Sequence, residues 1–136
     1  MTLTVELVSQ PESITKVEPL LQCVAERVPI HTEMYASMLL ALTEAVNNAI
    51  LHGNRSDHSK KVVVHVYCTT ETVEFEVTDQ GAGFDAAQIP DPTLPENIEM
   101  PGGRGVFLMQ HLSDKLVYTN KGRTARLTFF QLEKSK

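Results

Sequence analysis

Residues 44–53 read Glu-Ala-Val-Asn-Asn-Ala-Ile-Leu-His-Gly. They end a longer segment, beginning near residue 32, in which apolar side chains recur at the spacing of a helix: Met34, Met38, Leu42, Ala45 and Ala49. The pattern predicts one long amphipathic helix, with Thr32 as its N-cap and Gly53 as its C-terminal stop. Glu44 and Asn48 are four residues apart, so they share one face of this helix.

This carboxylate and amide pair has the chemistry of a magnesium–phosphate site. An Asn amide oxygen is a hard ligand suited to Mg²⁺, which keeps phosphates and waters rather than occupying an all-protein cage. A carboxylate one turn earlier could orient or deprotonate a hydroxyl that attacks a terminal phosphate. Taken alone, the pair is more simply read as a solvated polar face, or as an Asn that caps a neighbouring loop.

A second motif, Asp79-Gln-Gly81-Ala-Gly83-Phe84, follows an alternating strand pattern that ends at Val77. An Asp at this place can accept a hydrogen bond from an adenine amino group, and small glycines let the backbone approach the base closely. A plain turn explains the same residues, because Asp and Gly are typical of turns. The motif by itself leaves both interpretations open.

A third motif, Gly102-Gly103-Arg104-Gly105, precedes a short helix predicted over residues 106–112. Free N–H groups at a helix N-terminus, together with the positive end of the helix dipole, favour phosphate binding. A flexible turn is the competing interpretation. Arg104 could add charge at the phosphates, or it could pair at the surface with an acid of the preceding loop. The pattern GxxxxGK[ST] is absent, which excludes a P-loop enzyme.

The whole chain predicts an α+β fold. Strands are expected at residues 3–8, 62–68, 73–77, 115–119 and 123–132, and helices at 14–28, 32–53 and 106–112. Pro19 predicts a kink or a late start in the first helix. Paired helices and hairpins do not fit a Rossmann order. They fit a two-layer α/β sandwich, with helices on one face of a mixed, mainly antiparallel sheet. Residues 1–136 are expected to form a single domain.

Residues 85–101 differ in composition from the segments on either side. They contain four of the seven prolines and several acids: Pro90, Pro92, Pro95, Pro101, Asp85, Asp91, Glu96 and Glu99. A long loop of this kind in a compact domain tends to be a functional lid or to be disordered. We expect a lid that becomes ordered when a ligand binds.

Composition argues against several classes of function. The formal net charge of −5 argues against a general nucleic-acid binder, which normally carries a basic stripe. No apolar run approaches the roughly 18 residues that span a bilayer, and the N-terminus lacks the pattern of a signal peptide. The histidines show no metal-ligand spacing. We therefore expect a cytoplasmic protein without a direct nucleic-acid or membrane partner.

In their order and spacing, the three motifs resemble those of the GHKL (Bergerat-fold) ATPases, which include histidine kinases, gyrase-type topoisomerases and Hsp90. Residues 43–53 look most like the bacterial anti-sigma-factor serine/threonine kinases, and the resemblance covers nearly the whole chain. It implies an ATP site in which Asn48 holds Mg²⁺ and Glu44 acts as general base. Asp79 would contact adenine, with Gly81 and Gly83 lining the base.

The same resemblance places the third motif at the phosphates of ATP, beneath a mobile lid. Gly103 and Gly105 would cradle the phosphates, with Gly102 and Arg104 beside them. A proline-rich lid and an Arg between the glycines depart from the pattern of relatives, and they leave the partner open.

The function that this family implies is a kinase that binds a sigma factor and phosphorylates a STAS-type anti-anti-sigma protein, thereby regulating transcription by partner switching. Relatives form dimers, which makes a homodimer one candidate assembly for this chain. The alternative is a non-catalytic, nucleotide-gated module that sequesters a regulatory partner. The presence of Glu44 favours the enzyme, because a pure binding module has no need of a carboxylate there.

Overall fold

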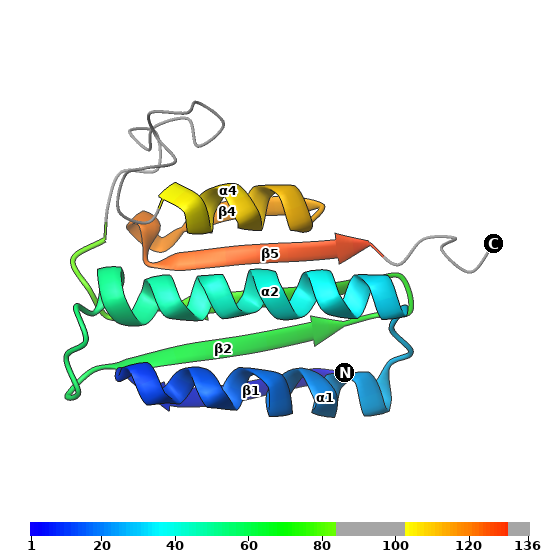
Figure 1. Ribbon diagram of the computed structural model, residues 1–136, viewed down its shortest axis with the longest axis horizontal. Helices are drawn as coiled ribbons and strands as arrows, with labels where there is room; N and C mark the ends of the chain where they lie inside the picture. Colours follow the sequence, from blue (N-terminus) through cyan, green and yellow to red (C-terminus); the bar gives the residue numbers. More distant parts are fainter. Residues whose placement is uncertain (84–102, 131–136) are drawn as a thin grey trace.

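The computed structural model describes residues 1–83 and 103–130 and arranges them as one layer of strands and one layer of helices (Figure 1). The elements, in chain order, are β1 (Thr2–Val8), the 3₁₀ helix η1 (Pro11–Lys16), α1 (Val17–Arg27), α2 (Thr32–Asn48), the π-helical turn η2 (Ala49–Gly53), β2 (Lys61–Cys68), β3 (Thr72–Thr78), α4 (Gly103–Leu112), β4 (Lys115–Thr119), the 3₁₀ turn η4 (Asn120–Gly122) and β5 (Thr124–Phe130).

The sheet has the strand order β1-β2-β3-β5-β4, and every pair of neighbouring strands described is antiparallel. The expected α+β class is therefore confirmed, but the expectation of a mixed sheet is wrong for the described part of the chain. β3 and β4 do run in the same direction. They do not pair, because β5 lies between them and is antiparallel to both.

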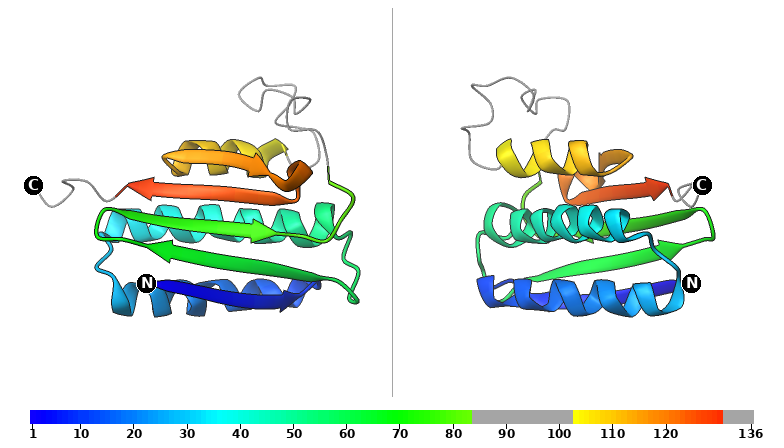
Figure 2. Two further views of the ribbon diagram at one scale, coloured as in Figure 1. Left: turned by 180° about the vertical axis from the view of Figure 1, so that it is seen from behind. Right: turned by 45° about the vertical axis from the view of Figure 1, so that its right-hand side comes forward.

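All the described helices lie on the same face of the sheet, as the view from behind in Figure 2 shows. The strands alternate accordingly: in β2, Val62, Val64 and Val66 are fully buried, whereas the residues between them are not. This period of two directs one row of side chains toward the helices and the other row away from them. The two-layer sandwich expected from the sequence is confirmed.

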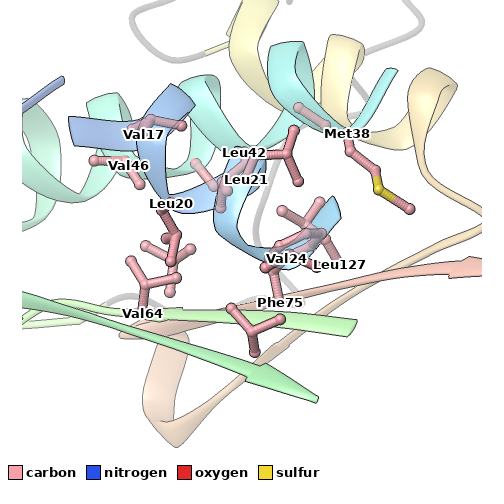
Figure 3. Close-up of a cluster of buried hydrophobic side chains, with 14 of the residues drawn as sticks. Val17, Leu20, Leu21, Val24, Met38, Leu42, Val46, Val64, Phe75 and Leu127 are labelled. Carbon is pink, nitrogen blue, oxygen red and sulfur yellow. The ribbon is translucent and has the colours of Figure 1, made fainter. Parts of the chain in front are cut away.

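The core lies between the two layers (Figure 3). Each of the two long helices contributes a buried stripe at helical spacing, and the three central strands contribute the opposite wall: Val17, Leu20, Leu21 and Val24 of α1, Met38, Leu42 and Val46 of α2, and Val64, Phe75 and Leu127 of the sheet. Removing such side chains from water supplies most of the stabilisation of a fold of this kind, at roughly 1.5–3 kcal/mol for each large one. This packing holds α2 firmly on the sheet.

The start of the first helical segment confirms the late start expected from Pro19. The chain forms the 3₁₀ helix η1 and becomes α-helical only at Val17, so Pro19 falls in the first turn of α1. Proline is tolerated in the first turn of a helix, because its fixed φ already suits the helical backbone. At the next helix the predicted cap is wrong. His31 is the N-cap of α2, Thr32 is its first helical residue, and no side-chain hydrogen bond caps it.

The third predicted helix is longer than expected, because α4 begins at Gly103 rather than at residue 106. Gly103 and Gly105 of the third motif therefore lie inside the first turn of the helix instead of preceding it. The expected lid over residues 85–101 lies outside the described residues, and so do Phe84 and Gly102.

α2 and η2 together form one continuous helical segment, Thr32–Gly53, of 22 residues. Its most apolar 18-residue window has a mean hydropathy of 1.2, so by length and composition alone it could cross a membrane. The expectation drawn from uninterrupted apolar runs missed this, because Glu44 and Asn48 interrupt the run. Core helices of soluble proteins commonly have such a composition. In this fold the segment packs on the sheet through five buried side chains of α2: Met38, Ala41, Leu42, Ala45 and Val46.

Candidate functional site

Glu44 and Asn48 occupy the last turns of α2, where both are half-buried. Beyond them the helix widens into the π turn η2. The Asn54 N–H donates to the Ala49 carbonyl at 2.8 Å, five residues back, and two left-handed residues then end the helix, Arg55 at φ 52° and Ser56 at φ 55°. Turns of this kind are rare and are often found at functional sites.

Gly53 does not have the role expected from the sequence. It is the last residue of the π turn rather than a left-handed stop, and its φ is not positive. A Cβ on Gly53 would overlap the carboxyl group of Asp79, and a Cβ on Gly81 would overlap the Gly53 carbonyl. Gly53 is thus required by close packing, and through it the end of the first motif contacts the start of the second.

Asp79 lies at the end of β3, as predicted, and is held on two sides. Its backbone N–H donates to the Arg123 carbonyl at 2.9 Å, and its Oδ1 accepts the Gly81 N–H at 2.8 Å. Within residues 1–83 and 103–130, Oδ2 accepts no hydrogen bond. That oxygen therefore remains available as an acceptor.

Burial raises the pKa of the Asp79 carboxyl, and the Gly81 N–H and the positive charges of Arg123 and Lys60 partly oppose this shift. Asp57 accepts the Ser59 hydroxyl at 2.7 Å and the Ser59 N–H at 2.9 Å, and these two hydrogen bonds lower its pKa. At Asp79 the single N–H bond does not offset the desolvation, which is the largest cause of its raised pKa.

Asp79→Asn is expected to flatten part of the dependence of stability on pH. The raised pKa means that the folded chain binds a proton more readily than the unfolded chain. The stabilisation from the neutral carboxyl is full below the ordinary Asp pKa near 3.8 and is lost as the pH rises through the folded value. Denaturant titrations across this window should show wild type losing stability with rising pH relative to Asp79→Asn. Parallel curves for the two proteins would contradict the desolvation of Asp79.

Residues 81–83 rest on the connection between the last two strands. Gly83 has φ +80°, and a Cβ there would overlap the Lys121 carbonyl. The Arg123 Nε donates to the Gly81 carbonyl at 2.8 Å, and its Nη2 donates to the Ala82 carbonyl at 3.4 Å. Gly81 and Gly83 are therefore both positions at which only glycine fits.

A second support for the Asp79 turn comes from Asn54, which is buried just beyond the π turn. Its Oδ1 accepts the Gln80 N–H at 2.7 Å, and its Nδ2 donates to the Lys61 carbonyl at 3.0 Å. The Gln80 Oε1 in turn accepts the Lys61 N–H at 2.8 Å. These three bonds join the end of the long helix, the start of β2 and the second motif.

Sequence reasoning missed Asn54 and Arg123. Their partners are 26 and 42 residues away, respectively. No spacing in the sequence indicates either contact. For Arg123, the one available signal was its place directly before the last strand, β5. That strand pairs with β3, so Arg123 lies near the end of β3 and the Asp79 turn.

The third motif meets the first at Gly105. A Cβ on this residue would lie 2.8 Å from the Asn48 Nδ2, 2.9 Å from the Glu44 Oε2 and 3.3 Å from the Asn48 Oδ1. The Glu44 and Asn48 side chains therefore both reach the first turn of α4. Gly103 begins that helix. The side chain of Arg104, like Gly102, lies outside the described residues.

One helical segment thus joins all three motifs. Its last α-helical turns contact Gly105, and its π turn contacts Asp79 and Gly81. In Figure 1 the end of η2, the end of β3, the start of α4 and the β4–β5 turn all gather at the left-hand edge of the molecule. Within the described ranges, no His, Cys, Asp or Glu side chains form a group of three or more that could hold a metal ion. Glu44 and Asn48 supply hard oxygen atoms, which suits a metal that takes its remaining ligands from phosphate and water.

The family model described as "Histidine kinase-like ATPase domain" matches residues 7–129 of the chain. The chain belongs to this family of histidine kinase-like ATPases. The matched range contains all of the residues described above, from Glu44 to Arg123.

This ATPase is 30% identical to serine-protein kinase RsbW of Bacillus velezensis, over 88% of this chain and 79% of that protein. It is 26% identical to serine-protein kinase RsbW of Listeria innocua, over 97% of this chain and 88% of that protein. It is 29% identical to serine/threonine-protein kinase BtrW of Bordetella bronchiseptica, over 68% of this chain and 66% of that protein. Among the histidine kinase-like ATPases, the chain thus groups with the RsbW serine-protein kinases, as its motifs predicted.

The fold of this ATPase also matches a solved structure, that of the RsbU and RsbW domains of Rv1364c from Mycobacterium tuberculosis. The TM-score is 0.67 and the sequence identity is 20% over 95% of this chain. The match spans about a third of the other chain, 32% of its length. At this identity the likeness bears on the fold alone, and it agrees with the two-layer arrangement described above.

Proposed function

We propose that this chain is an ATP- and Mg²⁺-dependent protein serine/threonine kinase. The observation that carries the proposal is that one helical segment places Glu44 and Asn48 against Gly105 and places its own end against Asp79. The segment thereby carries the proposed general base and the proposed metal ligand, and its end contacts the turn that carries the proposed adenine-binding carboxylate. Membership in the histidine kinase-like ATPases and similarity to proteins named serine-protein kinase RsbW support the same activity.

Asp79 would bind the adenine end of ATP. Its Oδ2 is free to accept the adenine amino group, because the contact with the Gly81 N–H occupies the other oxygen. Gly81 and Gly83, which have no side chains, let the turn approach the flat face of the base. The desolvation that raises the pKa of Asp79 also strengthens any hydrogen bond that this carboxylate makes.

The phosphates would lie at the N-terminus of α4. The first backbone N–H groups of this helix lack intrahelical partners, and the positive end of its dipole favours anions. Asn48, beside Gly105, would hold Mg²⁺ through its amide oxygen, and Gly102, Gly103 and Arg104 would complete the phosphate site. When bound, the metal would neutralise part of the charge on the phosphates.

Glu44 would act on the attacking hydroxyl. Its carboxylate accepts the proton of a substrate Ser or Thr hydroxyl while that oxygen forms a bond to the γ-phosphorus. The bond from the γ-phosphorus to the bridging oxygen breaks, and ADP leaves. Within the residues that the structure describes, no hydrogen bond or ion pair engages the Glu44 carboxylate or the Asn48 amide, so both are available for these roles.

Gly105→Ala is expected to impair the phosphate end without destabilising the fold. Ala is the better helix former, by about 0.8–1.0 kcal/mol, but its methyl group would displace the ends of Asn48 and Glu44. Displacements near 1 Å at a reacting centre can cost about 100-fold in rate. Phosphoryl transfer should therefore fall while the thermal unfolding temperature stays close to the wild-type value. Gln110→Ala, on the exposed side of the same helix, is the matched control, and full activity in Gly105→Ala would contradict the placement of the site.

The proposed substrate is a serine or threonine of a STAS-type anti-anti-sigma protein, and the proposed second partner is a sigma factor. The chain would release one and bind the other as nucleotide state changes, acting in the cytoplasm as one ATPase domain over residues 1–136 and as a homodimer. Similarity to the RsbW kinases over most of the chain supports this assignment.

Incubation of the chain with Mg²⁺, γ-labelled ATP and a candidate STAS protein tests the activity. Label on the STAS protein, dependent on Mg²⁺ and on its acceptor Ser or Thr, is the expected result. A nucleotide-dependent complex without label transfer would instead identify a non-catalytic binding module. Retention of a sigma factor on the immobilised chain with ATP, and its release by the unphosphorylated STAS protein, tests the partner switch separately.

A further inference from the structure

The turn that carries Asp79, residues 79–83, is held mainly by hydrogen bonds from other parts of the chain. Apart from the bond between the Asp79 side chain and the Gly81 N–H, the described polar contacts of residues 79–83 come from outside the turn. Asn54 holds the Gln80 N–H, and the Arg123 carbonyl holds the Asp79 N–H. The Arg123 side chain then holds the Gly81 and Ala82 carbonyls.

Arg123 is therefore the one residue in the described structure that binds the turn through both its backbone and its side chain. It lies directly after the left-handed turn Asn120–Gly122, whose φ values of 54°, 59° and 82° fix the direction from which its side chain approaches. The same turn presents the Lys121 carbonyl to Gly83. Residues 120–123 thus pack against residues 81–83 and support them.

A surface arginine would not have these contacts. Arg123 is half-buried, and its planar guanidinium uses two nitrogens on two successive carbonyls. Arg126, within β5, provides a contrast: it pairs with two carboxylates of the neighbouring strand β3, Glu76 at 2.9 Å and Glu74 at 3.7 Å. Arg126 stabilises strands, whereas Arg123 stabilises a turn that has no strand partner.

We propose that Arg123 is a positioning residue for nucleotide recognition: its guanidinium clamps the Gly81 and Ala82 carbonyls so that the Asp79 carboxylate faces the adenine amino group. This inference rests on the proposed function and adds a residue that determines base specificity. The clamp acts before the nucleotide arrives, because all of its contacts are made within the protein. It therefore affects recognition of the base and leaves the phosphate end, at Glu44 and Gly105, untouched.

The test compares Arg123→Met and Arg123→Lys with wild type in binding of ATP and GTP, in the rate of phosphoryl transfer at saturating ATP, and in thermal unfolding. Arg123→Met should weaken ATP binding roughly 10-fold or more, because a turn that has lost two hydrogen bonds from a charged group would hold its binding-competent arrangement for only a fraction of the time. The preference for ATP over GTP should fall with it, while the transfer rate at saturation stays at the wild-type level. A change in stability alone would leave that preference unaltered.

Arg123→Lys distinguishes the effect of the two-nitrogen contact from the effect of the positive charge. Lysine keeps a positive charge but cannot present two nitrogens in a fixed plane, so it should restore the ATP preference only in part. Full restoration by Arg123→Lys, or wild-type affinity and preference in Arg123→Met, would overturn the proposal. Arg126→Met is the matched control and should keep the wild-type preference for ATP.

The wild-type measurement distinguishes a failure of the proposed function from a failure of the Arg123 clamp. If wild type fails to bind ATP, or does not prefer it to GTP, the proposed function is wrong. If wild type prefers ATP and the Arg123 variants keep that preference, the nucleotide site stands and only the clamp is wrong.

Discussion

Glu44→Gln is expected to bind ATP as tightly as wild type and to transfer phosphate roughly 10²–10⁴-fold more slowly, which is the range of a general-base contribution. The substitution keeps the length and shape of the side chain, so the contact with Gly105 is preserved. It removes only the ability to accept a proton. Phosphoryl transfer depends mainly on positioning and charge, so the remaining site should still support a slow reaction.

The measurement is a single-turnover transfer assay together with an ATP titration in the presence of Mg²⁺. Glu33→Gln makes the same chemical change in the first turn of the same helix, where the side chain is exposed, and it should have no effect on either. Wild-type transfer by Glu44→Gln would show that another group accepts the proton. Loss of ATP binding would show that Glu44 belongs to the ground-state site.

Asp79→Asn is expected to weaken ATP binding by roughly 10- to 100-fold, because a hydrogen bond to a charged group contributes about 1.5–3 kcal/mol. An Asn can still accept the Gly81 N–H through Oδ1, so the turn should persist. Its amide nitrogen would replace Oδ2, and that nitrogen would meet the adenine amino group as donor against donor. The loss should appear equally for ATP and ADP, because both carry the same base.

Asp57→Asn is the matched control for this second variant. Asp57 accepts the N–H of the residue two positions later, as Asp79 does, but it lies exposed in a surface turn. Isothermal titration of both variants with ATP isolates the effect of the site from the effect of the turn. Unchanged affinity in Asp79→Asn would show that the adenine does not bind at this carboxylate.

Local patterns were sufficient to predict the elements that carry the site. Glu44 and Asn48 share a face because helix geometry alone requires it, and Asp79 ends a strand whose alternation is clear in the sequence. The order of the three motifs was also sufficient to predict the family, which the match over residues 7–129 shows.

What local patterns did not predict depends on strand order and close packing. Arg123 reaches the Asp79 turn only because β5 inserts beside β3. Gly53 looked like a helix stop because its contact with Asp79 arises between elements that are distant in sequence. The start of α4 was placed too late because its glycines have poor helix propensity, and packing against α2 overrides that preference.

The continuity of α2 and η2 fixes the distance between the two ends of the proposed nucleotide site. Glu44 and Gly53 are nine residues apart on one uninterrupted segment, which corresponds to roughly 13 Å at the usual helical rise. In the proposed binding mode, the adenine end and the phosphate end of the nucleotide would both lie along this segment. A nucleoside diphosphate bound at Asp79 would then lack the phosphate group that lies nearest to Glu44.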